Sequence, residues 1–199
     1  MSVFFPGFFE SNEYFIDEKR HFLKLHNEYR VYDPMGLHVG SVVQRLSKPQ
    51  KLLRLLLRKR VLPFHLELTD ANNVLLASMH RGWAFFLSRI TIFDEKGMVS
   101  GSIQQKFKLI RPRFIIFDAR ERRVAEIKGD WKAWSFTITD ARGNRIGTIN
   151  KKWGGMAREF FTTADKYHVT IEPSFAEDRN KMNIVVTAIT IDMVLKESQ

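Results

Sequence analysis

The chain contains no cysteine, and this absence removes several chemistries at once. Disulfides, cysteine-ligated zinc sites, thiol nucleophiles and S-acylation are all excluded. No run approaches the roughly 20 apolar residues that a membrane-spanning helix needs. The apolar N-terminus, Met1 to Phe9, lacks a basic region and is split by Pro6 and Gly7, so it does not have the pattern of a signal peptide. We therefore expect a cytoplasmic protein.

Catalytic and metal-binding motifs are also missing. The sequence has no nucleophile elbow, no phosphate-binding loop and no dinucleotide-binding glycine pattern. The six histidines are scattered, and His21 and His26 lack the spacing of a zinc-protease motif. We therefore predict no catalytic residues and a protein that is not an enzyme.

The composition is that of a folded domain with excess positive charge. The 199 residues are 44% hydrophobic, enough to bury a sizeable core, so we predict one domain over 1–199, with an aromatic tail over 1–12. The net charge of +10 favours an anionic partner, either nucleic acid or an anionic membrane surface. The alternative is a basic protein whose charge serves no specific partner.

One pattern occurs five times: apolar-x-apolar-x-Asp, then a turn, then apolar-small-x-apolar. Its aspartates are Asp33, Asp70, Asp94, Asp118 and Asp140. Alternating apolar residues predict strands with one buried face, so each copy predicts a β-hairpin. An Asp at this position can accept hydrogen bonds from turn amides, and we interpret all five as turn formers and not as a carboxylate cluster.

Two further positions in each copy predict backbone geometry. The third residue after the Asp tolerates positive φ in four copies, whereas Glu121 in the fourth predicts a different turn. The seventh residue is small and permits a bulge, a bend or a close approach. These small residues are Gly40, Ala77, Gly101, Ala125 and Gly147.

Five hairpins, with strands near Glu13–Glu18 and Tyr167–Ile171, make roughly a dozen strands. An open antiparallel sheet of this size tends to curl or split, and closure into a barrel removes its edges. The predicted fold is therefore mainly β, a closed barrel of about 12 antiparallel strands. Such a ring cannot be filled by its own side chains, so another segment must occupy the middle.

The remaining apolar segment is Asn183 to Leu195. Its β-branched residues favour a strand, while its length and continuous apolarity favour a buried helix, and the residues alone leave both open. On a helix, Val185, Ala188, Asp192 and Lys196 would form one stripe, and the last two an ion pair.

A basic segment interrupts the hairpin pattern at 47–61. It is rich in leucine, contains no acidic residue and predicts an amphipathic helix suited to a membrane interface. The alternative is a plug on one end of the barrel. Its basic residues are Lys48, Lys51, Arg54, Arg58, Lys59 and Arg60.

The tryptophans near the fifth hairpin are expected either in the barrel wall or at a lipid interface. Trp131 and Trp134 flank the start of a hairpin and are predicted to pack in the barrel wall. Trp153 follows Lys151 and Lys152, which suits a lipid interface, although a Trp that caps the core is the alternative.

Two runs after Trp131 are distinctive: Gly-Thr-Ile-Asn-Lys-Lys-Trp-Gly-Gly at 147–155 and Arg-Glu-Phe-Phe-Thr-Thr-Ala-Asp at 158–165. In these runs the sequence resembles the phospholipid scramblase family and the wider group of tubby-like C-terminal domains and LURP-one-related proteins. The resemblance implies a twelve-stranded barrel closed around a central C-terminal helix at 183–197. It also implies a link to phospholipids, through calcium-stimulated scrambling or phosphoinositide binding.

The calcium loop of the family is degenerate here. Only Asp165 matches an acidic ligand position, whereas Thr163 and Ser174 stand where the family pattern has acids. Calcium takes six or more oxygen ligands, so weak binding or none is expected, and no other cofactor is predicted.

The resulting expectation is a scramblase-like protein that binds anionic phospholipid or phosphoinositide at a membrane surface. The predicted anion-binding residues are the six of the basic segment together with Lys151, Lys152 and Trp153. Two alternatives stay open: a module that binds protein or nucleic acid on the same barrel, and a genuine phospholipid scramblase.

Overall fold

The structure, a computed structural model, describes residues 7–19, 28–45, 62–83, 89–106, 111–130, 132–151, 166–175 and 180–196. The strands in these ranges are β1 (Glu13–Lys19), β2 (Glu28–Tyr32), β3 (His38–Arg45), β4 (Phe64–Asp70), β5 (Leu75–Arg81), β6 (Arg89–Asp94), β7 (Val99–Lys106), β8 (Arg113–Asp118), β9 (Arg123–Asp130), β10 (Ser135–Asp140), β11 (Arg145–Asn150) and β12 (Lys166–Ile171). The helices are α1 (Gly7–Glu10), the short 3-10 helix η2 (Pro173–Phe175) and α4 (Lys181–Lys196).

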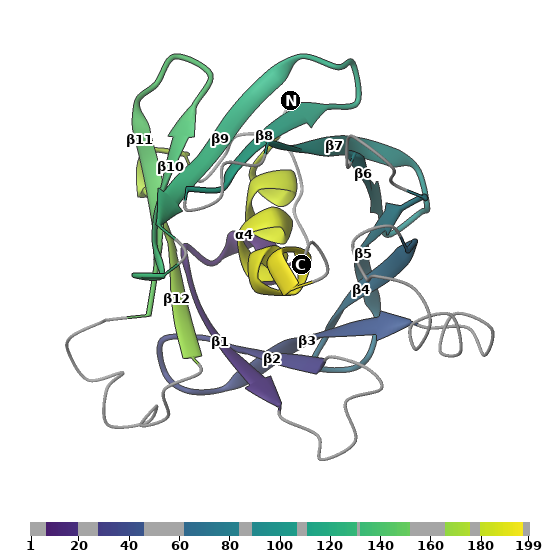
Figure 1. Cartoon of the computed structure of the whole chain (residues 1–199). Coiled ribbons are helices and arrows are strands. Elements are labelled where there is room, and N and C mark those ends of the chain that lie inside the picture. Colours follow the sequence, from purple (N-terminus) through teal and green to yellow (C-terminus); the bar gives the residue numbers. More distant parts are fainter. Residues whose placement is uncertain are drawn as a thin grey trace.

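The strands form a closed antiparallel barrel. Each strand pairs with its neighbours in sequence, and β1 also pairs with β12, which closes the ring. Figure 1 looks along the barrel and shows α4 inside the ring of strands. The predicted barrel around a C-terminal helix is confirmed.

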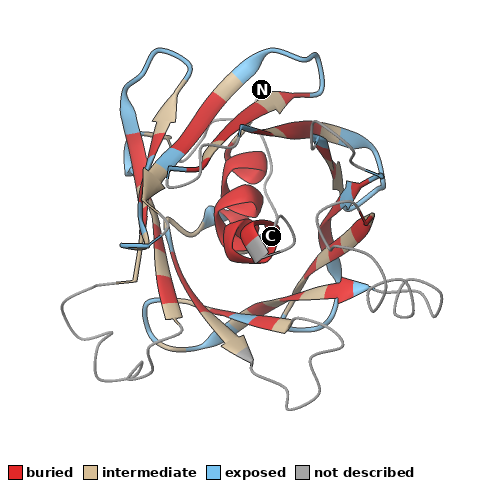
Figure 2. Cartoon of the chain, viewed as in Figure 1, coloured by how far each residue is buried: buried red, intermediate tan, exposed pale blue. Residues whose placement is uncertain are grey.

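Burial alternates along several strands, as the period of a strand requires, whereas β5, β7, β8 and β9 contain runs of three or four buried residues. In β4, Phe64, Leu66 and Leu68 are buried, and the residues between them are partly exposed. Figure 2 shows this alternation around the ring and shows that α4 is buried along its length. The core is therefore the contact between the inward face of the barrel and all sides of α4.

All five hairpins use the same turn. Asp94 Oδ1 accepts hydrogen bonds from the backbone N–H groups of Lys96 (3.0 Å) and Met98 (2.8 Å). The other four aspartates accept the same pair of bonds, which confirms that they are turn formers.

The prediction that the fourth turn would differ is wrong. Glu121 has φ 61°, close to the 74° of Gly97 at the same place in the third turn. A non-glycine residue in this region costs about 1–2 kcal/mol. The turn offsets that cost with two amide bonds to Asp118 and with a 2.8 Å bond from Arg122 Nε to the same carboxylate. A local side-chain network therefore overrides the preference of the single residue.

Each hairpin also bulges next to its small residue. In the third hairpin Ile92 pairs with Gly101 but Phe93 pairs with Val99, which leaves Ser100 as the extra residue. A Cβ on Gly101 would lie 2.3 Å from the carbonyl oxygen of Phe117 and 2.6 Å from Nδ2 of Asn183. The small residue thus lets the strand lie close both to β8 and to the first turn of α4.

The segment inside the barrel is a helix although its β-branched residues favour a strand. A helix satisfies its backbone hydrogen bonds within itself, whereas a strand surrounded by a closed sheet has no free edge to pair with. The hydroxyls of Thr187 and Thr190 donate to carbonyls one turn earlier, each at 2.6 Å. The polar side chains of the helix are therefore compatible with complete burial.

Polar contacts connect both ends of α4 to the barrel. Near its start, Asn183 Nδ2 donates to the carbonyl of Ser100 at 2.9 Å. Near its end, Tyr29 Oη donates to Asp192 Oδ2 at 2.5 Å, and Tyr167 Oη donates to the carbonyl of Ile189. Burial raises the pKa of Tyr29, so it stays protonated and remains a donor. The predicted ion pair of Asp192 with Lys196 lies outside the described side chains.

Phe9 and polar contacts attach residues 7–12 to the barrel and to α4. Phe9 of α1 is completely buried, and Tyr14 Oη donates to the carbonyl of Phe8 at 2.9 Å. Lys181 Nζ, also buried, donates to the carbonyl of Glu10 (3.2 Å) and to Asn12 Oδ1 (2.9 Å). Burial lowers the pKa of Lys181. These bonds join α1 to the first residue of α4.

Replacing Val186 with Asp tests the central helix. Val186 is 1% exposed inside the barrel, so a carboxylate there has to be buried without a partner and should lower the free energy of unfolding by more than about 3 kcal/mol. Urea unfolding followed by circular dichroism measures this. The matched control is Val99→Asp at a side chain that is 52% exposed, with an expected change within about 0.5 kcal/mol. A folded V186D protein with a wild-type midpoint would contradict the buried helix.

Replacing Gly97 with Ala tests the turns. Gly97 has φ 74°, and a Cβ there would meet no atom within 4 Å, so the substitution adds backbone strain and little else. The expected loss is about 1 kcal/mol in urea unfolding. Gly82→Ala is the control, because Gly82 is equally open but lies outside the left-handed region. Equal midpoints for the two variants would show that this turn does not need a left-handed residue.

Candidate functional site

The barrel has two different ends. The five tight turns, at 33–37, 71–74, 95–98, 119–122 and 141–144, lie at one end, which we name the turn end. The six longer connections, at 20–27, 46–63, 82–88, 107–112, 131–134 and 151–165, join strands at the other end, which we name the loop end. The helix α4 runs from the turn end, where Asn183 contacts Ser100, to the loop end, where Asp192 contacts Tyr29.

The connections that join strands at the loop end are rich in basic residues. These six connections contain fourteen basic and two acidic residues, whereas the five turn connections contain four basic and three acidic ones. Most of the excess positive charge therefore belongs to segments that start and finish at the loop end. The loop-end residues are Arg20, Lys24, Lys48, Lys51, Arg54, Arg58, Lys59, Arg60, Lys108, Arg111, Lys132, Lys151, Lys152 and Arg158, against Glu159 and Asp165.

All four tryptophans of the chain also belong to loop-end connections: Trp83, Trp131, Trp134 and Trp153. Among the described residues, Trp83 is 54% exposed, directly after the end of β5. A large aromatic ring with one polar N–H group prefers the boundary between water and lipid. The sequences of the loop-end connections thus combine basic residues with tryptophan.

The described part of the predicted site is Lys151. The Nζ atom of Lys151 lies 4.6 Å from the centre of the Trp134 ring. The backbone N–H of Lys151 donates a hydrogen bond to the backbone carbonyl of Trp134 at 3.2 Å. Trp134 in turn stacks on Tyr167, with ring centres 5.4 Å apart. The side chain of Lys151 is therefore held over an aromatic face that is anchored in the core. Trp134 packs in the wall, as predicted.

The pairing of Lys151 with Trp134 was not predicted, although the hairpin pattern contains the information. Ser135 pairs with Asn150 in the β10–β11 hairpin, so the next residues outward are 134 and 151. Extending the register by one residue brings the two side chains together. Extending a predicted hairpin register in this way is the signal that could have found the pair.

The other predicted site residues lie outside the described residues: Lys48, Lys51, Arg54, Arg58, Lys59, Arg60, Lys152, Trp153 and Asp165. The strand ends that flank them are described. Arg45 and Phe64 flank the basic segment, and Lys151 and Lys166 flank the second set, all at the loop end. The barrel therefore connects both sets of predicted anion-binding residues to one end.

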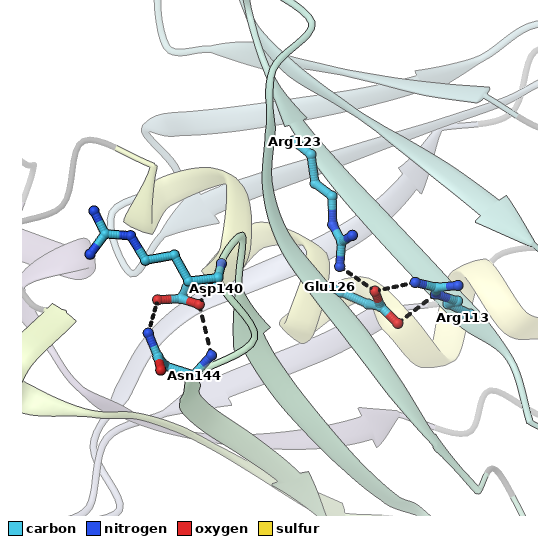
Figure 3. Close-up of polar contacts among 6 residues, drawn as sticks. Arg113, Arg123, Glu126, Asp140 and Asn144 are labelled. Atoms are coloured by element: carbon cyan, nitrogen blue, oxygen red, sulfur yellow. Dashed lines mark hydrogen bonds and ion pairs between the residues drawn. The ribbon is translucent and has the colours of Figure 1, made fainter.

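The outer wall at β8 and β9 carries a charged cluster, shown in Figure 3. Glu126 Oε2 accepts a hydrogen bond from Arg113 Nη2 at 2.6 Å and another from Arg123 Nη2 at 2.5 Å. The bond from Arg113 holds the pKa of Glu126 below its usual range, against the opposing effect of burial. One nearly buried carboxylate thus balances two arginines and leaves the wall with a positive excess.

Two findings limit the chemistry of the described residues. No helix within them is long and apolar enough to cross a membrane. No group of three or more His, Asp or Glu side chains within the described ranges is arranged to hold a metal ion.

The chain belongs to the scramblase family, since the family model described as Scramblase matches residues 23–198. A phospholipid scramblase family protein of Schizosaccharomyces pombe is 24% identical over 152 residues, which cover 71% of this chain and 39% of that protein. The Altered inheritance rate of mitochondria protein 25 of Saccharomyces cerevisiae is 23% identical over 197 residues, with 87% of this chain and 59% of that protein covered. The chain therefore spans less than two thirds of the length of either relative.

A solved structure shares the fold. An X-ray structure of an Arabidopsis thaliana protein superposes with a TM-score of 0.53 over 92% of this chain and 91% of that one, at 10% identity. The resemblance predicted from residues 131–167 is confirmed by the family match. Membership of this family points to a lipid-related function.

Replacing Glu126 with Gln tests the charged cluster. A carboxylate whose pKa is lowered in the folded state stabilises the fold above its usual pKa of 4.5 and loses that contribution as the pH falls through the folded value. E126Q should lower the free energy of unfolding by about 2 kcal/mol at pH 7 and should flatten its decline below pH 4.5. The control is Glu95→Gln on an exposed turn, with little expected change. Parallel pH profiles for E126Q and wild type would contradict the assignment.

Proposed function

We propose that this protein binds an anionic phospholipid surface peripherally, with the loop end of the barrel facing the membrane. The observation that carries the proposal is the segregation of charge, with fourteen of the basic residues in the six loop-end connections. Each basic residue near an anionic bilayer surface contributes about 1 kcal/mol to association. A set of this size at one end therefore supports both binding and a defined orientation.

The tryptophans favour lipid over nucleic acid. Trp rings at the end of a barrel suit the headgroup layer, whereas base stacking needs aromatic rings along a basic groove that follows the strand. The basic segment with Lys51, Arg54 and Arg58 supplies leucines beside its charges, which is the composition of a helix lying in the interface. The proposal places the protein in the cytoplasm and at a membrane surface.

The burial of α4 limits how this protein could interact with lipid. Residues 182–195 of α4 are buried within the barrel, so they do not face lipid while the barrel is closed. We propose binding as the activity of this chain and expect no calcium requirement, because Asp165 is the sole acid retained from the family's calcium loop.

Vesicle co-sedimentation tests the proposal. Wild type should pellet with phosphatidylcholine vesicles that contain phosphatidylserine or a phosphoinositide and not with phosphatidylcholine alone, and pelleting should weaken with salt. The variant K51E/R54E/R58E should bind at least about tenfold more weakly. The matched control K96E/R120E/R142E changes the net charge equally at exposed turn-end positions and should bind nearly as wild type.

The alternatives have separate outcomes. Negligible pelleting with both vesicle types would refute lipid binding, and a salt-sensitive gel shift with RNA or DNA would then support the nucleic-acid alternative. Dithionite quenching of labelled lipid in proteoliposomes, with calcium titrated, distinguishes binding from scrambling. Calcium-dependent quenching would overturn the proposal that the chain binds lipid without moving it.

A further inference from the structure

A row of three basic residues crosses the outer wall of the barrel beside the loop end. Lys106 at the end of β7 pairs with Arg113 of β8, and Arg113 pairs with Lys128 of β9. Gln105, which precedes Lys106, and Phe114, which follows Arg113, are buried. Because side chains alternate along a strand, the three basic side chains point outward. Three positive side chains thus stand on adjacent strands in register.

This arrangement costs stability in the isolated protein. Like charges directly opposite one another on neighbouring strands destabilise a sheet. Among the described residues, Glu126 is the one acidic side chain bonded to the row; it also binds Arg123 and interacts electrostatically with Lys128. Within the same residues, Lys106 and Lys128 make neither an ion pair nor a side-chain hydrogen bond. The described part of the row therefore carries more positive charge than Glu126 balances.

At the loop end, basic residues on the opposite side of the barrel have acidic partners. There Arg45 Nε lies 2.8 Å from Glu67 Oε2, and Lys166 Nζ lies 3.4 Å from Asp17 Oδ2. These strand-end cations have acidic partners on neighbouring strands. The row on β7–β9 differs from these pairs in having three basic residues side by side.

The row continues onto the rim of the loop end. Arg111 and Lys132 are exposed in the connections that precede β8 and follow β9, and the exposed Trp83 follows β5. We name this set of six residues the basic half-rim: Trp83, Lys106, Arg111, Arg113, Lys128 and Lys132. Asp130 lies between Lys128 and Lys132 in the sequence. Its carboxylate accepts hydrogen bonds from the backbone N–H groups of Lys132 and Ala133.

We propose that the basic half-rim is the face that lies against the phospholipid headgroups, so that the barrel docks tilted, with the β7–β9 wall turned toward the membrane and Trp83 at headgroup depth. This inference rests on the proposed function and adds residues outside the basic segment. The wall is the convex outer face of a barrel, which a flat anionic surface can contact over three strands at once. Trp83 follows β5, two strands from β7 at the same end of the barrel, and a Trp there suits the boundary of the bilayer.

The charge test uses K106E/K128E. Both side chains are exposed, and the new carboxylates face Arg113, so the fold should be retained, which circular dichroism and thermal unfolding verify. Affinity for phosphatidylcholine vesicles with about one third phosphatidylserine should fall about tenfold or more. The matched control K96E/R142E changes the net charge equally at the turn end and should stay within about threefold of wild type.

The orientation test uses the absence of cysteine, which makes any introduced thiol unique. W83C carrying an environment-sensitive fluorophore should shift to the blue on binding these vesicles. M98C, labelled in the same way at a turn-end position that is 58% exposed, should not shift.

The outcomes separate the two proposals. Wild-type protein that ignores anionic vesicles refutes the proposed function and this inference together. Wild-type binding with unchanged affinity of K106E/K128E, or with a shift of the label at position 98 and not at 83, overturns the half-rim and leaves lipid binding in place. If K106E/K128E loses affinity for RNA in a gel shift but keeps it for vesicles, the half-rim is a nucleic-acid surface and the inference is wrong.

Discussion

The closure of twelve strands around an interior too wide for their own side chains is the constraint on which the rest of this structure depends. Something must fill the interior, and it must bring its own backbone hydrogen bonds, because a closed sheet offers none. The helix α4 meets both conditions although its sequence favours a strand. Its polar side chains then become structural: Asn183 bonds to the bulge at Ser100, and Asp192 accepts a bond from Tyr29. Barrel and helix therefore stabilise each other.

The five identical turns give the molecule its polarity. Each turn is closed by one aspartate and one left-handed residue, so that end of the barrel is compact and nearly neutral. The six longer connections join strands at the opposite end, and their sequences contain most of the excess positive charge.

The basic residues on the outer wall at the loop end form two groups. On one side of the loop end, Arg45 and Lys166 have acidic partners, while Lys106, Arg113 and Lys128 stand together on adjacent strands. In the docking mode that we propose, an approaching anionic surface would reduce the repulsion within that row, so that a feature that destabilises the free protein would contribute to association.

The sequence by itself determined the hairpins, their aspartate turns and the approximate number of strands, because these depend on residues within about ten positions of one another. It also showed the basic segment and the Lys-Lys-Trp run as chemistry suited to lipid. The sequence left strand and helix open for Asn183 to Leu195, because β-branching favours a strand and continuous apolarity favours a buried helix. The prediction from Glu121 was wrong, because Arg122 and Asp118 stabilise the turn in which it lies. The order and register of the strands decided the rest. They placed the strand ends that flank 46–63, 82–88 and 151–165 at one end of the barrel and aligned Lys106, Arg113 and Lys128 into a row, since contacts between distant residues exist only once the barrel has closed.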